Sequence, residues 1–245
     1  MKVIAVSNLK GGVGKTITAT SISYLLGVEN NKKVLVVDAD QQANTSRTFN
    51  RFDQEGTGIM QLLEGEEHIA DLIQNTAYEN IDILPSNMYL VRTNEHLMFT
   101  EDNQIERLKE ALEEVRDNYD YVVCDCGLIL DMTVLNVIMA ADQIIIPIKA
   151  GGYGIEGAEN LQEQIQEIRS DLKTKVLMTM KAENKINRET EEWMKQNYKN
   201  RMFQTAIRRS VVVKKAETAF MPLPAISKRS NPTKDYEELV KEIMK

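Results

Sequence analysis

The sequence is poor in cysteine and proline and contains no long apolar run. Of its 245 residues, two are cysteine and five are proline. Cys124 and Cys126 stand two residues apart on an expected strand, where they can hardly bond to each other, so they favour a reducing cytosol. The longest apolar candidate, residues 134–148, is interrupted by polar residues and falls short of the roughly 20 residues that a membrane helix needs. We therefore expect a soluble cytoplasmic protein with no membrane partner, and residues 1–4 leave no room for a signal peptide.

The chain also lacks internal repeats, low-complexity linkers and a proline-rich hinge. Its length suffices for one large α/β domain with a full core. We expect residues 1–245 to form a single domain. Because the first apolar run begins at Val3, we expect no helix-turn-helix domain in front of it.

Apolar, β-branched runs alternate with amphipathic segments along the chain. The expected strands are residues 3–6, 34–37, 81–84, 121–124, 143–148 and 176–180. Residues 17–26, 104–116 and 155–172 are predicted helices, the last two from apolar residues at three-to-four spacing. Continuous apolar strands between helices predict an α/β fold, with a mostly parallel twisted sheet covered by helices on both faces. Residues 200–231 are the least regular, and we expect short elements there over the sheet edge.

The net charge of −7 conceals an uneven distribution. Residues 199–234 contain nine lysines and arginines but a single glutamate. A basic segment on an acidic protein is a candidate polyanion-binding surface. Composition alone leaves open the alternative of solvated lysines scattered over several faces.

A glycine-rich turn between the first strand and the first helix carries the clearest chemistry. Residues 8–16 read Asn-Leu-Lys-Gly-Gly-Val-Gly-Lys-Thr. Glycines let backbone N–H groups surround an anion, and the helix N-terminus adds its positive dipole. Lys15 would reach β- and γ-phosphates and Thr16 would bind Mg²⁺, as in phosphate-binding loops of NTPases. The strict pattern fails at Leu9, which replaces a glycine, and a second lysine, Lys10, stands beside it.

Three aspartates follow buried strands at positions where a parallel sheet meets its ligand. Asp38 and Asp40 end the second strand, and Asp125 ends the run from Tyr121. Such carboxylates can order Mg²⁺ and its waters and position an attacking water. A helix cap or a turn former is the structural alternative for each. Cys124 and Cys126 also leave open an iron–sulfur cluster shared by two chains, although a small buried side chain is the simpler role for Cys124.

These motifs together resemble one family. Residues 10–16, Asp38-x-Asp40-x-Gln42 and Asp125-Cys126 are similar to those of the deviant-Walker ATPases of the ParA/MinD group, and most similar to ParA-type partition ATPases. The resemblance extends over almost the whole chain and includes Asn136, residues 146–148 with Glu156-Gly157, and residues 207–211. It implies a P-loop NTPase domain that hydrolyses ATP with Mg²⁺.

The resemblance also implies roles for single residues. Lys10 would reach the partner's phosphates in a nucleotide-sandwich homodimer, and Asp40 would assist hydrolysis together with Asp38. Thr16, Asp38 and Asp125 would serve the metal. The implied nucleotide contacts are Lys10, Gly11, Gly12, Val13, Gly14, Lys15, Thr16, Ile17 and, on the base side, Met180 and Arg208.

The family's second activity implies a DNA surface. The ATP-bound dimer would bind DNA without reading sequence through Arg209, Arg208, Lys214 and Lys215, which would place the protein on the nucleoid. A centromere-binding adaptor protein would stimulate its slow hydrolysis.

Three residues differ from the usual sequence of this family, and the sequence leaves other functions open. Gln41, Gly127 and Arg208 stand where the family usually has proline, which predicts looser loops near the site. The main alternative is a MinD-like membrane-cycling ATPase, but the polar face of residues 235–245 is mainly acidic and anionic lipid would repel it. A nitrogenase-iron-protein-like reductase and a metabolic kinase or synthetase are further alternatives.

Overall fold

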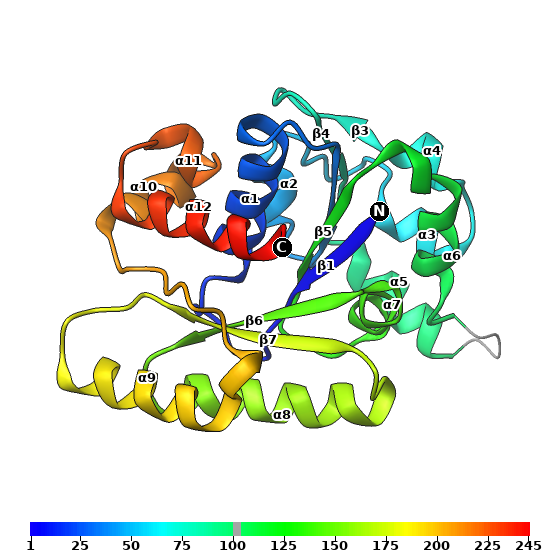
Figure 1. Cartoon of the computed structure of the whole chain (residues 1–245). Helices are drawn as coiled ribbons and strands as arrows, with labels where there is room; N and C mark the ends of the chain where they lie inside the picture. The colour runs from blue at the N-terminus through cyan, green and yellow to red at the C-terminus, as the bar shows by residue number, and fades with distance from the viewer. Residues whose placement is uncertain (100–103) are drawn as a thin grey trace.

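A computed structural model of the chain describes residues 1–99 and 104–245. In this part of the chain a seven-stranded sheet crosses the molecule in the order β3-β4-β2-β5-β1-β6-β7 (Figure 1). All neighbouring strands are parallel except β3, which pairs antiparallel with β4 at one edge. The strands are β1 Lys2–Val6, β2 Val34–Ala39, β3 Gln74–Asn75, β4 Ile81–Leu84, β5 Tyr121–Cys126, β6 Gln143–Lys149 and β7 Lys173–Thr179.

Helices cover both faces of the sheet, as Figure 1 shows. On one face lie α1 Lys15–Tyr24 with its π-helical continuation η1 Leu25–Glu29, α10 Val211–Ala219, α11 Leu223–Ile226 and α12 Asn231–Ile243. On the other face lie α3 Ile59–Glu64, α4 Ile69–Leu72, α5 Leu90–Met98, α6 Arg107–Glu114, α7 Met132–Ala140, α8 Gly152–Ile168 and α9 Lys185–Tyr198. The remaining helical elements are α2 Asn44–Thr48 and two 3-10 turns, η2 Arg116–Asn118 and η3 Lys199–Arg201.

The strands supply both cores because their side chains alternate between the two faces. In β1, Val3 and Ala5 belong to the core under α3–α9, whereas Ile4 and Val6 belong to the core under α1 and α12. All four are buried. This explains why the strands read as continuous apolar runs rather than alternating ones.

The predicted α/β fold is confirmed, and each predicted strand has a counterpart. The three predicted helices correspond to α1, α6 and α8 with shifted ends, and β3 was not predicted. The expectation for residues 200–231 is correct only in part. Residues 202–208 pair with the edge strand β7 and the residues after it, but α11 packs against α1 and α10 packs against α11. They do so because Ala216 and Leu223 join the core beneath α1.

The C-terminal helix α12 packs against α1 and η1. Its apolar residues Tyr236, Leu239, Val240 and Ile243 are buried there, and the Tyr236 hydroxyl lies 2.9 Å from that of Thr18. This apolar face is therefore not available to a lipid surface. Among the residues that the structure describes, no helix is both long enough and apolar enough to cross a membrane.

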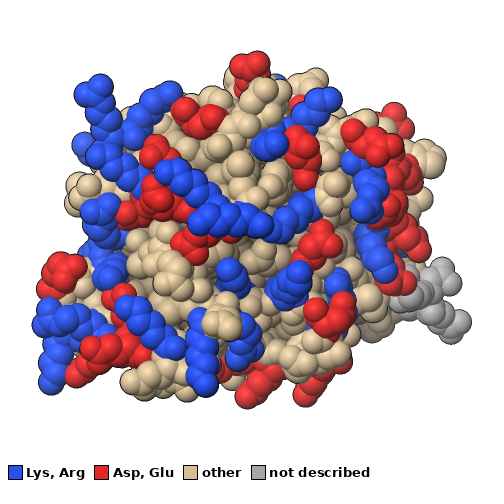
Figure 2. Space-filling model, viewed as in Figure 1, with Lys and Arg blue, Asp and Glu red and all other residues tan. Residues whose placement is uncertain are grey.

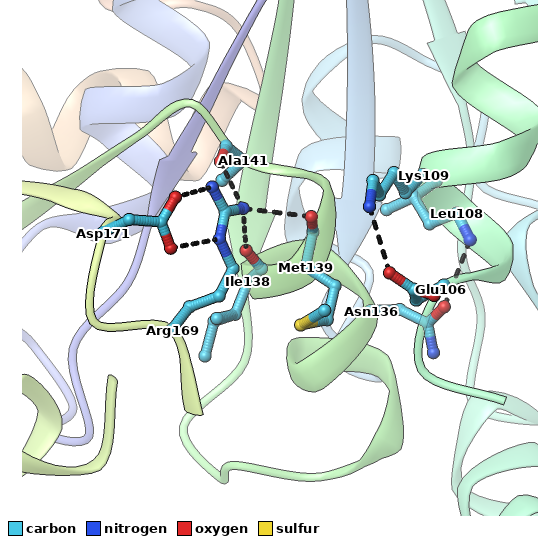
Figure 3. A network of polar contacts seen from close by, with 9 residues as sticks. All are labelled: Glu106, Leu108, Lys109, Asn136, Ile138, Met139, Ala141, Arg169 and Asp171. Carbon is cyan, nitrogen blue, oxygen red and sulfur yellow. Dashed lines mark hydrogen bonds and ion pairs between the residues drawn. The ribbon is translucent and has the colours of Figure 1, made fainter. Parts of the chain in front are cut away.

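Polar contacts fix α7 at its C-terminal end and at its middle (Figure 3). The Arg169 guanidinium donates to the carbonyls of Ile138, Met139 and Ala141 at 2.8–3.1 Å and also contacts Asp171. In the middle of α7, the Asn136 side chain accepts from the backbone N–H of Leu108 and donates to the carbonyls of Gln104 and Met132. Asn136 thus joins α7 to the start of α6, a structural task for a residue that the family resemblance singled out.

Candidate active site

The glycine-rich turn forms a loop between β1 and α1 that closes on a buried lysine. Gly14 has φ 91°, a left-handed conformation that L side chains rarely adopt, and it leads directly into α1. Lys15 is only 7 % exposed, and its Nζ donates to the carbonyls of Asn8 at 3.1 Å and Lys10 at 3.4 Å. Burial lowers the pKa of Lys15, against the opposing charges of Asp125 and Asp40. The Lys15 ammonium group is therefore positioned to bind an anion in the loop.

The next two strand ends bring buried carboxylates together. Asp38 of β2 and Asp125 of β5 are register partners, and both are fully buried. Asp38 Oδ1 accepts from the Asp40 N–H at 3.2 Å, and Oδ2 accepts from the N–H and the hydroxyl of Ser46, both at 2.7 Å. Burial and then the charge of Asp125 raise the pKa of Asp38 to about 8, although the Ser46 bonds oppose this.

Asp125 keeps one oxygen unused. Its Oδ2 accepts from the Thr45 hydroxyl at 2.8 Å, whereas Oδ1 is buried and has no hydrogen-bond partner among the described residues. Burial raises the pKa of Asp125 to about 6, with the Thr16 and Thr45 hydroxyls opposing. Within residues 1–99 and 104–245, no three acidic, histidine or cysteine side chains converge as a metal cage. This donor set suits Mg²⁺, which protein sites hold through one or two carboxylates together with substrate phosphates and water.

A cleft of about 340 Å³ opens in front of the loop. Besides loop residues from Gly11 to Ile17, it is lined by Asp40, Gln42, Asn44 and Leu128. Its other wall is the end of α10, with Ala216, Glu217, Phe220 and Met221. Asn44, Phe220 and Met221 were not predicted as site residues. No local pattern distinguishes Phe220 and Met221, because the fold alone brings the end of α10 to the loop.

A second cavity of about 490 Å³ adjoins the first and shares Gly14, Ile17 and Glu217 with it. Met180 and Arg208, the predicted base-side residues, both line this cavity. The Arg208 guanidinium is bound by Asp235 of α12, with nitrogen–oxygen distances of 2.6–3.1 Å. Thr179, just before Met180, donates from its hydroxyl to the Val13 carbonyl at 2.8 Å and so ties β7 to the loop.

Lys10 passes close under α8. A Cβ placed on Gly157 would lie 2.5 Å from Lys10 Cγ and 2.9 Å from Asn8 Oδ1. Because no methyl group fits at such distances, Gly157 is the residue that lets the Lys10 side chain run beside this helix. Gly157 belongs to the Glu156-Gly157 motif of the family resemblance, and this close approach is a physical reason for glycine there.

The candidate DNA-binding residues surround the start of α10. Arg209, Lys214 and Lys215 are exposed, and Arg209 and Lys214 line the second cavity. Lysine and arginine side chains gather at the corner of the molecule that holds α10 and α11 in Figure 1, as Figure 2 shows. Arg208 differs from its neighbours because Asp235 balances its charge.

Both cysteines lie inside the sheet. Cys124 and Cys126 are at most 1 % exposed and belong to the core under α3–α9. Burial, with the nearby Asp125 charge as a lesser cause, raises the pKa of the Cys124 thiol to about 12. Thiols placed in this way cannot reach a second chain, so the shared iron–sulfur cluster has no support in this structure.

Comparisons with known proteins agree with this geometry. Residues 1–178 match the family described as an AAA domain. The sporulation initiation inhibitor protein Soj of Bacillus subtilis is 31% identical, over 99% of this chain and 98% of its own. The chromosome partitioning protein ParA of Myxococcus xanthus is 29% identical, over 100% of this chain and 88% of its own. A solved structure of a Borrelia burgdorferi plasmid partition protein bound to AMPPNP has a TM-score of 0.87 and 25% identity, and the match covers 99% of this chain and 98% of that one.

Proposed function

Because the chain belongs to the ParA-type partition ATPases, we propose that it binds ATP with Mg²⁺, dimerises around the nucleotide and then holds DNA without sequence preference. One observation carries this proposal: the wall of the nucleotide cleft opposite the phosphate loop is α10, the helix that also presents Lys214 and Lys215. A single helix thus contacts both the nucleotide space and the candidate DNA surface.

The nucleotide roles follow from the site. Lys15 and the loop amides would bind the phosphates, and the base would lie toward Met180 and Arg208 in the second cavity. Thr16 and the unpartnered oxygen of Asp125 would hold Mg²⁺, with Asp38 ordering its waters. When bound, Mg²⁺ supplies charge neutralisation of the phosphates. Asp40 is half-buried on the cleft wall, where it would position the attacking water.

Dimerisation would complete the site through Lys10. Lys10 is half-buried beside α8 and directly precedes Gly11, which lines the cleft, whereas Lys15 is buried. A lysine in this position would meet the phosphates of a partner subunit, so that ATP acts as the switch for assembly. Each dimer would then carry two copies of the α10 surface, which strengthens its binding to DNA. A centromere-binding adaptor protein would stimulate the slow hydrolysis that resets the switch.

The test compares assembly and binding of three variants. We expect light scattering to show a dimer with ATP and Mg²⁺ for the wild type, a persistent dimer for Asp40→Ala, and a monomer for Lys10→Ala. Lys185→Ala, an exposed lysine on α9, is the matched control and should behave as wild type. In pulldowns with plasmid DNA and with anionic liposomes, only DNA should retain the ATP-bound protein. A monomer under every condition, or retention on liposomes alone, contradicts the proposal.

A further inference from the structure

The short helix α2 lines the nucleotide cleft with one side and contacts the two buried carboxylates with the other. Asn44 and Thr48, one helical turn apart, line the cleft. Thr45 and Ser46 point the other way and are fully buried. The helix follows Asp40 and Gln42, which also line the cleft. The way α2 packs therefore determines the positions of these two residues and of Asn44 and Thr48.

The Ser46 hydroxyl joins α2 to two strand ends, those of β2 and β4. Its Oγ donates to Asp38 Oδ2 at 2.7 Å and accepts from the Ser86 N–H, just beyond β4, at 2.9 Å. The Ser46 N–H donates to the same Asp38 oxygen at 2.7 Å. Because Asp38 Oδ1 already accepts from Asp40 N–H, the carboxylate is held at both oxygens and cannot rotate.

Thr45 acts on the neighbouring carboxylate. Its hydroxyl donates to Asp125 Oδ2 at 2.8 Å, and Oδ1 has no hydrogen-bond partner within residues 1–99 and 104–245. The two oxygens of a carboxylate are equivalent, so the Thr45 bond does not choose between them; it fixes the plane of the Asp125 carboxylate about its terminal bond. The orphaned oxygen is thereby kept in a fixed direction.

We propose that Thr45 and Ser46 are positioning residues for ATP hydrolysis, which seat α2 on Asp125 and Asp38 and so fix Asp40 relative to the bound nucleotide. This inference rests on the proposed roles of the three aspartates. Neither hydroxyl reaches the cleft, so neither would contact ATP. Their effect should fall on the chemical step, where a displacement of 1 Å can cost on the order of 10²-fold in rate.

Two matched pairs of variants test the inference. Thr45→Val keeps the shape of the side chain but removes its hydroxyl, whereas Thr45→Ser keeps the hydroxyl. Ser46→Ala removes the second hydroxyl, and Ser23→Ala is its control, because the Ser23 hydroxyl is equally buried but bonds only to the Ala19 carbonyl in α1. Steady-state ATP hydrolysis, binding of a fluorescent ATP analogue and thermal melting are measured for each protein.

We expect kcat to fall by roughly 10- to 100-fold in Thr45→Val and Ser46→Ala, with nucleotide affinity within about threefold of wild type. Thr45→Ser and Ser23→Ala should keep kcat within about threefold of wild type. Equal kcat in the Thr45→Val and Thr45→Ser proteins would overturn the inference. So would a parallel loss of affinity and melting temperature, which marks a merely structural role.

Asp40→Ala separates this inference from the proposed function. If Asp40→Ala abolishes hydrolysis while Thr45→Val and Ser46→Ala are unaffected, the assignment of the aspartates stands and the positioning role fails. If Asp40→Ala hydrolyses ATP at the wild-type rate, the proposed site itself is wrong.

Discussion

The phosphate-binding end of the sheet and the basic segment at the start of α10 differ in how they hold their charged side chains: the first buries them and the second exposes them. Around the phosphate loop, Lys15, Asp38 and Asp125 are almost completely buried, and each is held by hydrogen bonds to neighbouring elements. At the basic segment, Arg209 and Lys215 are exposed, and no ion pair within 4.0 Å joins them to another residue that the structure describes.

This difference separates two kinds of sensitivity. In the first region a single methyl or hydroxyl group decides where a charge lies, because packed interiors do not yield to small changes in volume. In the second region the sum of charges matters more than their exact positions, because contacts to DNA phosphates carry no sequence information. Substitutions can test each half of this comparison.

The largest effect is expected for Gly157→Ala. The new methyl group must displace Lys10 or α8, because its carbon would lie 2.5 Å from Lys10 Cγ. We expect ATP-dependent dimerisation and hydrolysis to fall at least about tenfold, since the geometry at a reacting centre tolerates little displacement. Nucleotide binding to the monomer should persist through Lys15. Light scattering and ATPase assays measure the two effects.

Asn160→Ala controls for this change. It introduces alanine on the exposed side of the same helix, where both substitutions favour helix formation. Apart from the clash with Lys10, replacing glycine by alanine in a helix stabilises it by about 0.5–1 kcal/mol. A loss of activity without lower thermal stability would therefore be due to a displaced Lys10. Normal dimerisation of Gly157→Ala would show that the first region is less rigid than we describe.

A smaller effect is expected when Arg208 and Arg209 are compared. Arg209→Ala should weaken DNA binding and make the dependence of log affinity on log salt shallower by about 1 per protomer. Arg208→Ala should change this slope less, because Asp235 already neutralises Arg208. It should instead lower the free energy of unfolding by about 1–3 kcal/mol, because the buried Asp235 then loses the guanidinium and keeps the bond from the backbone N–H of residue 208.

DNA titrations at several KCl concentrations and urea melts of both variants distinguish these results. Should Arg208→Ala reduce the salt slope as much as Arg209→Ala, the two arginines would act alike. The contrast that the Asp235 ion pair creates within the basic segment would then be wrong.

The two regions also differ in how far the sequence predicts them. The phosphate loop and the strand-end aspartates are local signals, because glycine spacing and apolar runs fix their backbone and strand register brings Asp38 beside Asp125. The ion pair between Arg208 and Asp235 spans 27 residues, and nothing in either local sequence indicates it. Likewise, α10 reaches the cleft only because Ala216 joins the core under α1. Tertiary packing, rather than local pattern, therefore determines the second region.

The smallest effect concerns the strand that carries Asp125. Because burial raises the pKa of Cys124 to about 12, its folded-state thiol keeps its proton at pH 10, where an unfolded thiol with a pKa near 9.0 has lost it. The stability that Cys124 contributes is therefore fully present below about pH 9 and is lost as pH rises toward 12, at about 1.4 kcal/mol per pH unit. The difference in free energy of unfolding between wild type and Cys124→Ala should shift by about 1 kcal/mol between pH 9 and pH 10, because half of the unfolded thiol has already lost its proton at pH 9. Urea melts measure it, and alkylation at pH 8 should modify only unfolded protein. If this difference in free energy of unfolding does not change with pH, or if native protein is alkylated rapidly, then water reaches the end of β5. The phosphate-binding region would in that case resemble the exposed basic segment more closely than its buried aspartates indicate.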